Sequence, residues 1–285
     1  MLSLKPFHPT CTLARRGIVL AAAASPHNRH RRYESTKAAA YDGHIPLNWF
    51  ENAFLAVGSG IVLLTDPRRA DMVAALGETT AGPFLPFLRE RMLESAEGRR
   101  ILKQRPRINT RTVDMSALAA LPENTFGRSY VSWLEHCNVT PDSREPVHYI
   151  DDPELAYVMQ RYRECHDLYH CVLSLPVDGL SEIAVKAFEA ANLGLPMAAM
   201  SATLGHLRLS PQRRTRYFQE YLPWALRCGG SAQNLITVYW EERWAQDIGE
   251  LKKELGISEP PPTPWKKFRR TEMEKQEQEQ NGVLE

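Results

Sequence analysis

The sequence predicts an all-α protein with a single helical domain, on three observations. Apolar residues recur at helical spacing through most of residues 47–257. Helix starts are marked by capping residues followed by proline, as in Asp151-Asp152-Pro153-Glu154. Strand patterns are scarce, and only Val147–Ile150 has the composition of a short extended piece. Because no repeat or internal linker divides this stretch, one domain is expected.

The first predicted helix, Ala53–Leu64, is the longest apolar stretch of the chain. It is shorter than the roughly 20 apolar residues that span a membrane, so we expect it to be buried or to lie on a membrane surface. The other helices are predicted from periodicity and from their start and stop residues. They are a helix after Thr65-Asp66-Pro67, then Phe84–Leu93, a helix from Thr125, the long run from Asp152 to Leu175, and Ser181–Leu193, Gln212–Tyr221 and Ile236–Leu255.

The two ends differ from the body in composition. Residues 1–33 are rich in Arg, Ala and Ser and almost free of acids, which is typical of a mitochondrial presequence. A secretory signal and a disordered basic arm are the alternatives. Residues 34–46 are then a linker and 47–257 the helical domain. Residues 258–285 begin with prolines and continue as a polar, low-complexity tail, for which we expect no packed structure.

The net charge of +1 hides two parts of opposite sign. Residues 1–40 carry seven basic side chains and one acidic one, which leaves 28 basic and 33 acidic groups in the rest. This acidic body argues against a dedicated nucleic-acid binder, which needs a basic excess. The five cysteines include no CxxC pair, which excludes a disulfide scaffold and a cysteine-rich zinc module.

The chemistry is concentrated near the end of the longest predicted helix. His166 and His170 are four residues apart, so their imidazoles lie about 40° apart around the helix axis and one turn along it. Asp167 falls within the same arc of about 100°. Glu182 begins the next helix after a proline and an Asp-Gly break. A short turn there would bring its carboxylate over the two histidines.

These four residues predict a metal site, because burying two carboxylates without a cation is costly. A histidine pair that is hydrogen-bonded in the core is the alternative. Asp167 stands where HExxH proteases have glutamate, which disfavours that class. The donor set suits Zn²⁺, Fe²⁺ or Mn²⁺ and does not select among them. Cys165 and Cys171, which flank the histidines, are expected to be small buried residues rather than ligands.

The motif and its surroundings resemble the ubiquinone (coenzyme Q) biosynthesis protein family, the fourth member of the Coq series. The family signature is HDxxH followed after eleven residues by Glu, and it matches His166-Asp167-Leu168-Tyr169-His170 and Glu182. Similar blocks cover most of residues 47–257. They include DPRRADMVAALGETT (66–80), EGRRILKQRPRINTRTVD (97–114), LPENTFGRSY (121–130), EIAVKAFEAANLGLPM (182–197) and VYWEERW (238–244).

The resemblance implies a helical mitochondrial protein, peripheral on the matrix side of the inner membrane and part of a multi-enzyme complex. It implies metal-dependent removal of the C1 carboxyl from a 4-hydroxy-3-methoxy-5-polyprenylbenzoate, with or without oxidative hydroxylation of that carbon. The family's metal ligands carry over onto His166, Asp167, His170 and Glu182, which would act in catalysis through the metal, usually zinc. The alternative is a lipid-binding scaffold that organises the pathway's enzymes and holds a structural metal.

Expected partners follow from the same resemblance: the polyprenylated hydroxybenzoate, other ubiquinone-biosynthesis enzymes and the inner-membrane surface. Nucleic acid is not expected, and a homo-oligomer stays open. Ala53–Leu64 and Leu193–Leu209 are candidates to hold the polyprenyl tail, with ordinary core packing as the alternative. Two basic clusters are candidates to contact anionic headgroups, with a solvated face as the alternative: Arg213-Arg214-Arg216 and Lys266-Lys267-Arg269-Arg270.

Overall fold

The computed structural model describes residues 38–66 and 69–262. The described residues all belong to one compact unit. The predicted presequence, most of the predicted tail and the basic cluster at residues 266–270 lie outside the described residues. These features and the domain boundaries therefore stay predictions.

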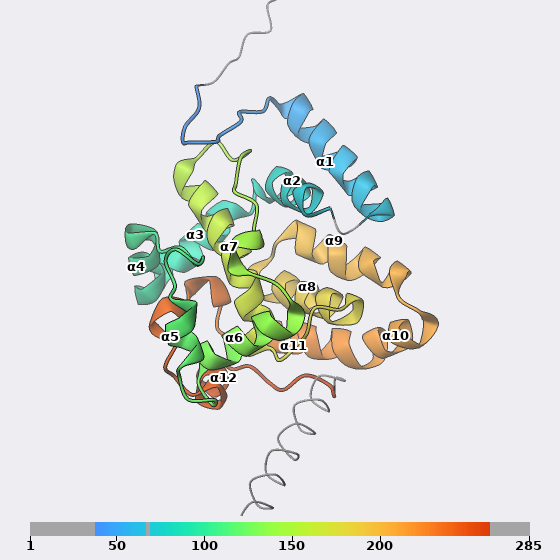
Figure 1. The fold of residues 1–285 in the computed structure, drawn as a ribbon. Coiled ribbons are helices and arrows are strands. Elements are labelled where there is room, and N and C mark those ends of the chain that lie inside the picture. Colours follow the sequence, from blue (N-terminus) through green and yellow to red (C-terminus); the bar gives the residue numbers. More distant parts are fainter. Residues whose placement is uncertain (1–37, 67–68, 263–285) are drawn as a thin grey trace, which may run out of the picture. The chain divides into compact units, whose positions relative to one another are not determined.

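This unit is built from helices (Figure 1). The α-helices, in chain order, are α1 (Trp49–Thr65), α2 (Ala70–Ala81), α3 (Leu85–Glu94), α4 (Ala96–Gln104), α5 (Met115–Ala119), α6 (Phe126–Cys137), α7 (Pro153–Val172), α8 (Gly179–Leu193), α9 (Pro196–Leu204), α10 (Pro211–Arg216), α11 (Leu222–Ser231) and α12 (Ile248–Glu254). Short 3₁₀ turns are η1 (Pro141–Ser143), η2 (Gly205–Arg208), η4 (Leu235–Thr237) and η5 (Trp240–Glu242), and η3 (Tyr217–Tyr221) is a π-helical turn.

The all-α prediction is confirmed. Residues 38–66 and 69–262 contain no strand, only an isolated antiparallel bridge between Thr125 and Asp247. The segment Val147–Ile150, predicted to be extended, joins no ladder. Its backbone N–H groups donate instead to the side chains of Gln160 and Glu78, which fix it against α7 and α2.

Helix α7 is the central element, and its side chains from Ala156 to Val172 are all buried. Helices α3 and α6 and the turn η4 pack against it. The helix begins where the sequence predicts, because the Asp152 side chain accepts from two backbone N–H groups and Pro153 follows. It ends at Val172, slightly before the predicted Leu175, and Ser174 then adopts a left-handed φ of 54°.

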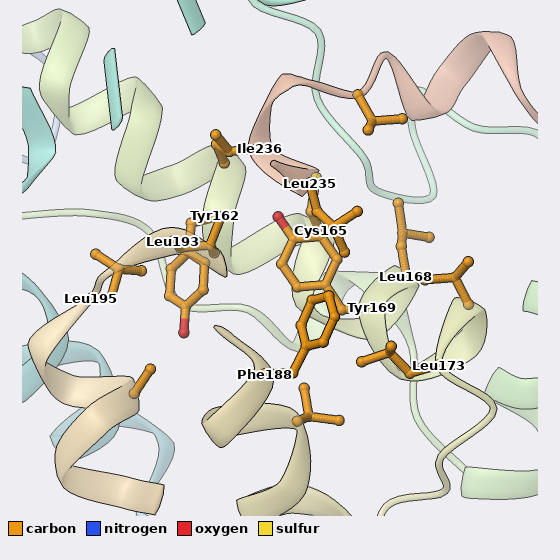
Figure 2. Packing of buried hydrophobic residues seen from close by; sticks show 14 of the residues in the cluster. Tyr162, Cys165, Leu168, Tyr169, Leu173, Phe188, Leu193, Leu195, Leu235 and Ile236 are labelled. Carbon is orange, nitrogen blue, oxygen red and sulfur yellow. The ribbon is translucent and has the colours of Figure 1, made fainter. Parts of the chain in front are cut away.

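Helix α8 follows α7 after a short turn. The Asp178 side chain caps its start by accepting from the Leu180 N–H, and Gly194 ends it at a φ of 73°. Helices α9 and α11 cover α8. Figure 2 shows part of the core to which both helices contribute, including Tyr169 of α7 and Phe188 of α8. The predicted arrangement of two helices at the candidate site is therefore present.

The apolar stretch near the amino end forms α1, which packs against α2. The expectation of a buried helix is wrong here, because Ser59 is the buried residue of α1 and its large apolar side chains are mostly exposed. Helical periodicity predicts that a helix has an apolar face, but not what covers that face. This exposure is compatible with the other expectation, a helix on a membrane surface.

The predicted helix Ile236–Leu255 is also wrong. This stretch forms the turns η4 and η5 and ends in the short helix α12. Its backbone carbonyls form hydrogen bonds with partners that are distant in sequence. The Val238 carbonyl accepts from Arg161, and the Trp244 carbonyl accepts from the Gly127 N–H. Trp240 is fully buried between these contacts. Tertiary hydrogen bonds and aromatic packing thus override the local helical pattern.

The predicted helix Gln212–Tyr221 is only partly correct. Helix α10 passes into the π turn η3, and the chain continues as α11 up to Ser231. Pro223 lies at an early position of α11, directly after the π turn. Its missing N–H thus falls at an irregular junction of the helical stretch and does not end it.

Candidate metal centre

His166, His170 and Glu182 come together where α7 faces the start of α8. One potential ligand atom from each lies within 4.8 Å of the other two, and this trio is the metal-ligand cluster found in the described part of the chain. The Glu182 carboxylate lies between the rings, with Oε1 3.4 Å from His166 Nε2 and Oε2 3.1 Å from His170 Nε2. The i, i+4 spacing on α7 places the two ring centroids 4.8 Å apart at right angles.

The other nitrogen of each imidazole has its own partner. His166 Nδ1 lies 2.6 Å from Glu189 Oε1, and His170 Nδ1 lies 3.2 Å from the Leu175 carbonyl oxygen. Both partners are acceptors for a proton on Nδ1, and Lys186 Nζ also lies 3.2 Å from His166 Nδ1. A neutral ring with its proton on Nδ1 presents the Nε2 lone pair on the side of Glu182, where a bound cation would separate it from the carboxylate. Metal-binding histidines are commonly oriented in this way by an acceptor behind the ring.

The charges of the trio are strongly coupled. Burial favours the neutral acid at Glu182, but the His166 and His170 imidazoles hold the pKa of this carboxyl well below its usual value. Burial and the Lys186 ammonium lower the pKa of His166, yet the carboxylates of Glu189 and Glu182 outweigh them and raise it. Negative charge is therefore concentrated around the two imidazoles, which favours a cation between them.

The donor set fits a divalent metal. Two imidazoles and one carboxylate are found in catalytic zinc sites and in the facial triad of non-haem iron enzymes. The Glu182 side chain is 38% exposed, whereas those of His166 and His170 are 7% and 1% exposed. Three protein ligands that are accessible from the carboxylate side leave room for a water or a substrate atom. The residues do not choose among Zn²⁺, Fe²⁺ and Mn²⁺.

Asp167, the fourth predicted ligand, is not part of this cluster. Its buried carboxylate forms an ion pair with Arg144, which follows η1. One step along an α-helix turns the side chain by about 100°, so Asp167 leaves the helix on a different side from His166. Its role as a ligand stays a prediction.

Sequence reasoning missed the residues behind His166. Glu189 and Lys186 are both buried on α8, and the buried Tyr162 lies one turn before His166. A signal was present, because Glu189 lies seven residues and Lys186 four residues after Glu182. This spacing places all three on one face of α8, next to the predicted ligand.

The two cysteines beside the histidines are buried, as predicted. Neither belongs to the metal-ligand cluster found in the described residues. Burial raises the pKa of the Cys165 thiol to about 12, which disfavours the thiolate that a metal would bind. Cys165 instead belongs to the hydrophobic core, where Figure 2 shows it among apolar side chains.

Comparisons with known proteins identify the family to which this chain is similar. The family model of coenzyme Q (ubiquinone) biosynthesis protein Coq4 matches residues 41–261. The mitochondrial ubiquinone biosynthesis protein COQ4 of Laccaria bicolor is 65% identical over 242 residues, which are 85% of this chain and 82% of that protein. The COQ4 homolog of Aedes aegypti is 56% identical over 213 residues, which are 75% of this chain and 78% of that protein.

The fold also has a counterpart among solved structures. A Nostoc punctiforme protein, provisionally named a ubiquinone biosynthesis protein, superposes with a TM-score of 0.60 at 20% identity. The superposition covers 73% of this chain and 99% of that one, and at this identity it supports the fold alone. The family match spans His166, His170 and Glu182 and leaves out most of both ends, as the resemblance in sequence predicts. The chain belongs to the Coq4 family of coenzyme Q (ubiquinone) biosynthesis proteins.

Proposed function

We propose that the protein uses a divalent metal, with Zn²⁺ as the first choice, to remove the C1 carboxyl of a 4-hydroxy-3-methoxy-5-polyprenylbenzoate. Family membership supports the pathway, which is ubiquinone biosynthesis. The observation that carries the proposal is the cluster of His166, His170 and Glu182, which combines two buried imidazoles with a partly exposed carboxylate. This is the arrangement expected of a catalytic ion.

Each ligand residue would have its own role in binding the ion. His166 and His170 would hold the ion through Nε2, and Glu182 through a carboxylate oxygen. When bound, the cation supplies Lewis-acid stabilisation of negative charge. In decarboxylation the bond between C1 and the carboxyl carbon breaks, CO₂ leaves, and a proton takes its place on the ring.

Oxidative hydroxylation of the same carbon is the variant of this proposal. It needs an oxidant such as O₂, and Zn²⁺ has no redox chemistry. The electrons would then come from the electron-rich ring or from a redox metal such as Fe²⁺ in the same site.

The second candidate is a lipid-binding scaffold with a structural metal. It is favoured by the way the trio connects two helices, since both histidines lie on α7 and Glu182 lies on α8. An ion bound there would hold α8 against α7 and stabilise the fold directly. The two candidates differ in turnover, because a scaffold needs the metal but converts no substrate.

We also place the protein on the matrix side of the mitochondrial inner membrane, beside the other enzymes of the pathway. Several relatives are named mitochondrial. No helix in the described residues is long and apolar enough to cross a bilayer. Support for surface binding comes from α1, where a stripe of five apolar side chains is 58% to 73% exposed. We define this α1 stripe as Phe50, Phe54, Val57, Ile61 and Leu64.

Exposed groups beside the α1 stripe suit a lipid surface. The Arg208 side chain donates to the Leu64 carbonyl and so connects the end of α1 to η2. Leu204 and Leu207 are exposed there, and Arg208 is an exposed cation. Apolar side chains would enter the interface while Arg208 meets anionic headgroups. This location also gives access to a substrate whose polyprenyl tail stays in the bilayer.

The proposal is tested by His170→Ala in the purified protein and in cells. We expect loss of bound metal, measured by elemental analysis, and accumulation of a carboxylated polyprenyl intermediate, measured by mass spectrometry. His206→Ala is the matched control, because this histidine of η2 packs against Phe218 of η3 and belongs to no metal-ligand cluster among the described residues. Normal ubiquinone levels with folded His170→Ala would overturn the catalytic reading. Absence of turnover by metal-loaded wild type, with loss of the enzyme complex in the variant, would favour the scaffold.

A further inference from the structure

A buried polar network lies behind His166, on the side away from Glu182. Glu189 is completely buried, and its two oxygens are divided between different partners. Oε1 lies 2.6 Å from His166 Nδ1, while Oε2 accepts from Lys186 Nζ at 2.9 Å and from the Tyr162 hydroxyl at 2.7 Å. Lys186 Nζ also lies 3.2 Å from the Tyr162 oxygen, 3.2 Å from His166 Nδ1 and 4.0 Å from Glu182 Oε1.

The network determines which nitrogen of His166 carries the proton. Glu189 Oε2 accepts from both the Lys186 ammonium and the Tyr162 hydroxyl, which are the partners of a carboxylate. Glu189 Oε1 therefore faces His166 as an acceptor. A contact of 2.6 Å between this oxygen and a ring nitrogen requires a proton between them, so Nδ1 donates. This holds for both the neutral and the protonated ring.

The consequence appears at the other nitrogen. A neutral imidazole has one N–H, so a proton on Nδ1 leaves the lone pair on Nε2, which is 3.4 Å from Glu182 Oε1. With the proton on Nε2 instead, an N–H would point into the metal-ligand cluster and the Nδ1 lone pair would face a carboxylate. The network disfavours that arrangement, because two acceptors 2.6 Å apart repel each other and the contact of Lys186 Nζ with Nδ1 is longer, at 3.2 Å.

We propose that Glu189 is a positioning residue that holds His166 in its metal-binding tautomer and orientation, while Lys186 and Tyr162 fix Glu189 in turn. The inference rests on the proposed metal site and assigns that site a supporting layer. An ion pair that served only the stability of α8 would need Lys186 and Glu189 alone. Here Oε1 has His166 as its partner, and the ring comes from another helix.

The variant Glu189→Gln tests the proposal with little change in size. Lys186 and Tyr162 both donate, so they retain the single oxygen of the amide. The amide NH₂ then faces His166 Nδ1, which must accept, and the ring proton moves to Nε2. We expect the dissociation constant for Zn²⁺ or Co²⁺, measured by titration of the metal-free protein, to rise about 10–100-fold. We expect ¹⁵N NMR of the metal-free variant to show the Nε2–H tautomer of His166.

The matched control is Glu164→Gln. Glu164 is also buried and ion-paired, and it lies on α7, but its partners are Arg107 and the Ile108 N–H rather than the histidines. We expect this variant to lose stability and to keep the wild-type metal affinity. Glu189→Asp and Tyr162→Phe weaken the network less severely, and we expect metal affinities between those of wild type and Glu189→Gln.

The outcomes separate this inference from the proposed metal site. A folded Glu189→Gln protein with wild-type affinity and the wild-type tautomer overturns the inference and leaves the metal site standing. A wild-type protein that binds neither ion overturns the metal site, and the tautomer in the metal-free protein then still tests how Glu189 acts on His166. If Glu189→Gln does not fold, wild-type affinities of both Glu189→Asp and Tyr162→Phe overturn the inference.

Discussion

Arg144 and Asp167 form an ion pair in which the carboxylate side chain is 2% exposed and the arginine side chain 34% exposed. Burial lowers the pKa of the Arg144 guanidinium, and the Asp167 carboxylate outweighs this effect and raises it. Because Asp167 directly follows His166, the pair fixes the segment after η1 against the helix that carries both histidines. Removal of either partner therefore has a structural effect next to the metal-ligand cluster.

The variant Arg144→Met should destabilise the protein, because it leaves the buried Asp167 carboxylate without its cation. We expect a loss of about 1–3 kcal/mol in the free energy of unfolding, less than for a fully buried pair because Arg144 is partly solvated. Urea denaturation of the metal-free protein measures it. The control is Arg69→Met, which breaks an exposed pair with Asp71. Equal stabilities of the two variants would show that the Arg144 pair contributes nothing.

Metal binding by Asp167→Asn and Glu182→Gln distinguishes the two carboxylates. Glu182 contacts both imidazoles, whereas Asp167 is engaged with Arg144. We expect Glu182→Gln to abolish the rise in melting temperature that added Zn²⁺ gives the wild type, and chelation to reverse that rise. We expect Asp167→Asn to reduce it only slightly. An equal loss in both variants would identify Asp167 as a ligand.

Acid should weaken the fold through Glu189. The pKa of this carboxyl is about 2 in the folded protein and 4.5 in its ordinary state. A lowered folded-state pKa contributes stability that is complete above about pH 4.5 and is lost as the pH falls toward 2. We expect on the order of 3 kcal/mol of unfolding free energy to disappear across that window.

Chemical denaturation of the metal-free protein at several pH values measures this loss. In Glu189→Gln the corresponding pH dependence should be reduced, because the residue no longer ionises. Parallel curves for the variant and the wild type would contradict the assignment of this acid-sensitive contribution to Glu189.

The start of α7 and the residues of the metal-ligand cluster could be predicted because their signals are local. Asp152 and Pro153 mark the start of the helix by capping alone, and the spacing of His166 and His170 fixes their common side. Glu182 could be predicted as a third ligand because the turn between α7 and α8 is short. Its distance from the rings, and the accessibility of the trio from its side, needed the structure.

Other features depend on partners that are distant in sequence. The Arg161 side chain donates a hydrogen bond to the Val238 carbonyl, 77 residues away in the sequence. No local pattern near Val238 reveals this contact. Asp167 had the right residue type and spacing for a ligand, but Arg144 of another segment engages its carboxylate. The coverage of α1 is likewise decided by the tertiary fold, since its apolar stripe would look the same in a core helix.

The α1 stripe makes a prediction about membranes that leaves the core untouched. A charge at Phe54, which is 73% exposed at the middle of the stripe, would have to enter the lipid interface and be desolvated there. We expect Phe54→Glu to bind vesicles that contain anionic phospholipid at least about tenfold more weakly than wild type, since a fully buried Phe contributes about 1.5–3 kcal/mol. Vesicle co-sedimentation measures the binding. The melting temperature should stay unchanged, because the side chain is exposed.

The control for this experiment is Leu226→Glu, which introduces the same charge at an exposed apolar position of α11, outside the α1 stripe. We expect this variant to bind vesicles like the wild type, because the new charge lies outside the surface that would enter the lipid. Equal weakening by both substitutions would indicate general repulsion by anionic lipid. Full vesicle binding by Phe54→Glu, together with a change in oligomeric state, would instead identify the α1 stripe as a contact between protein copies.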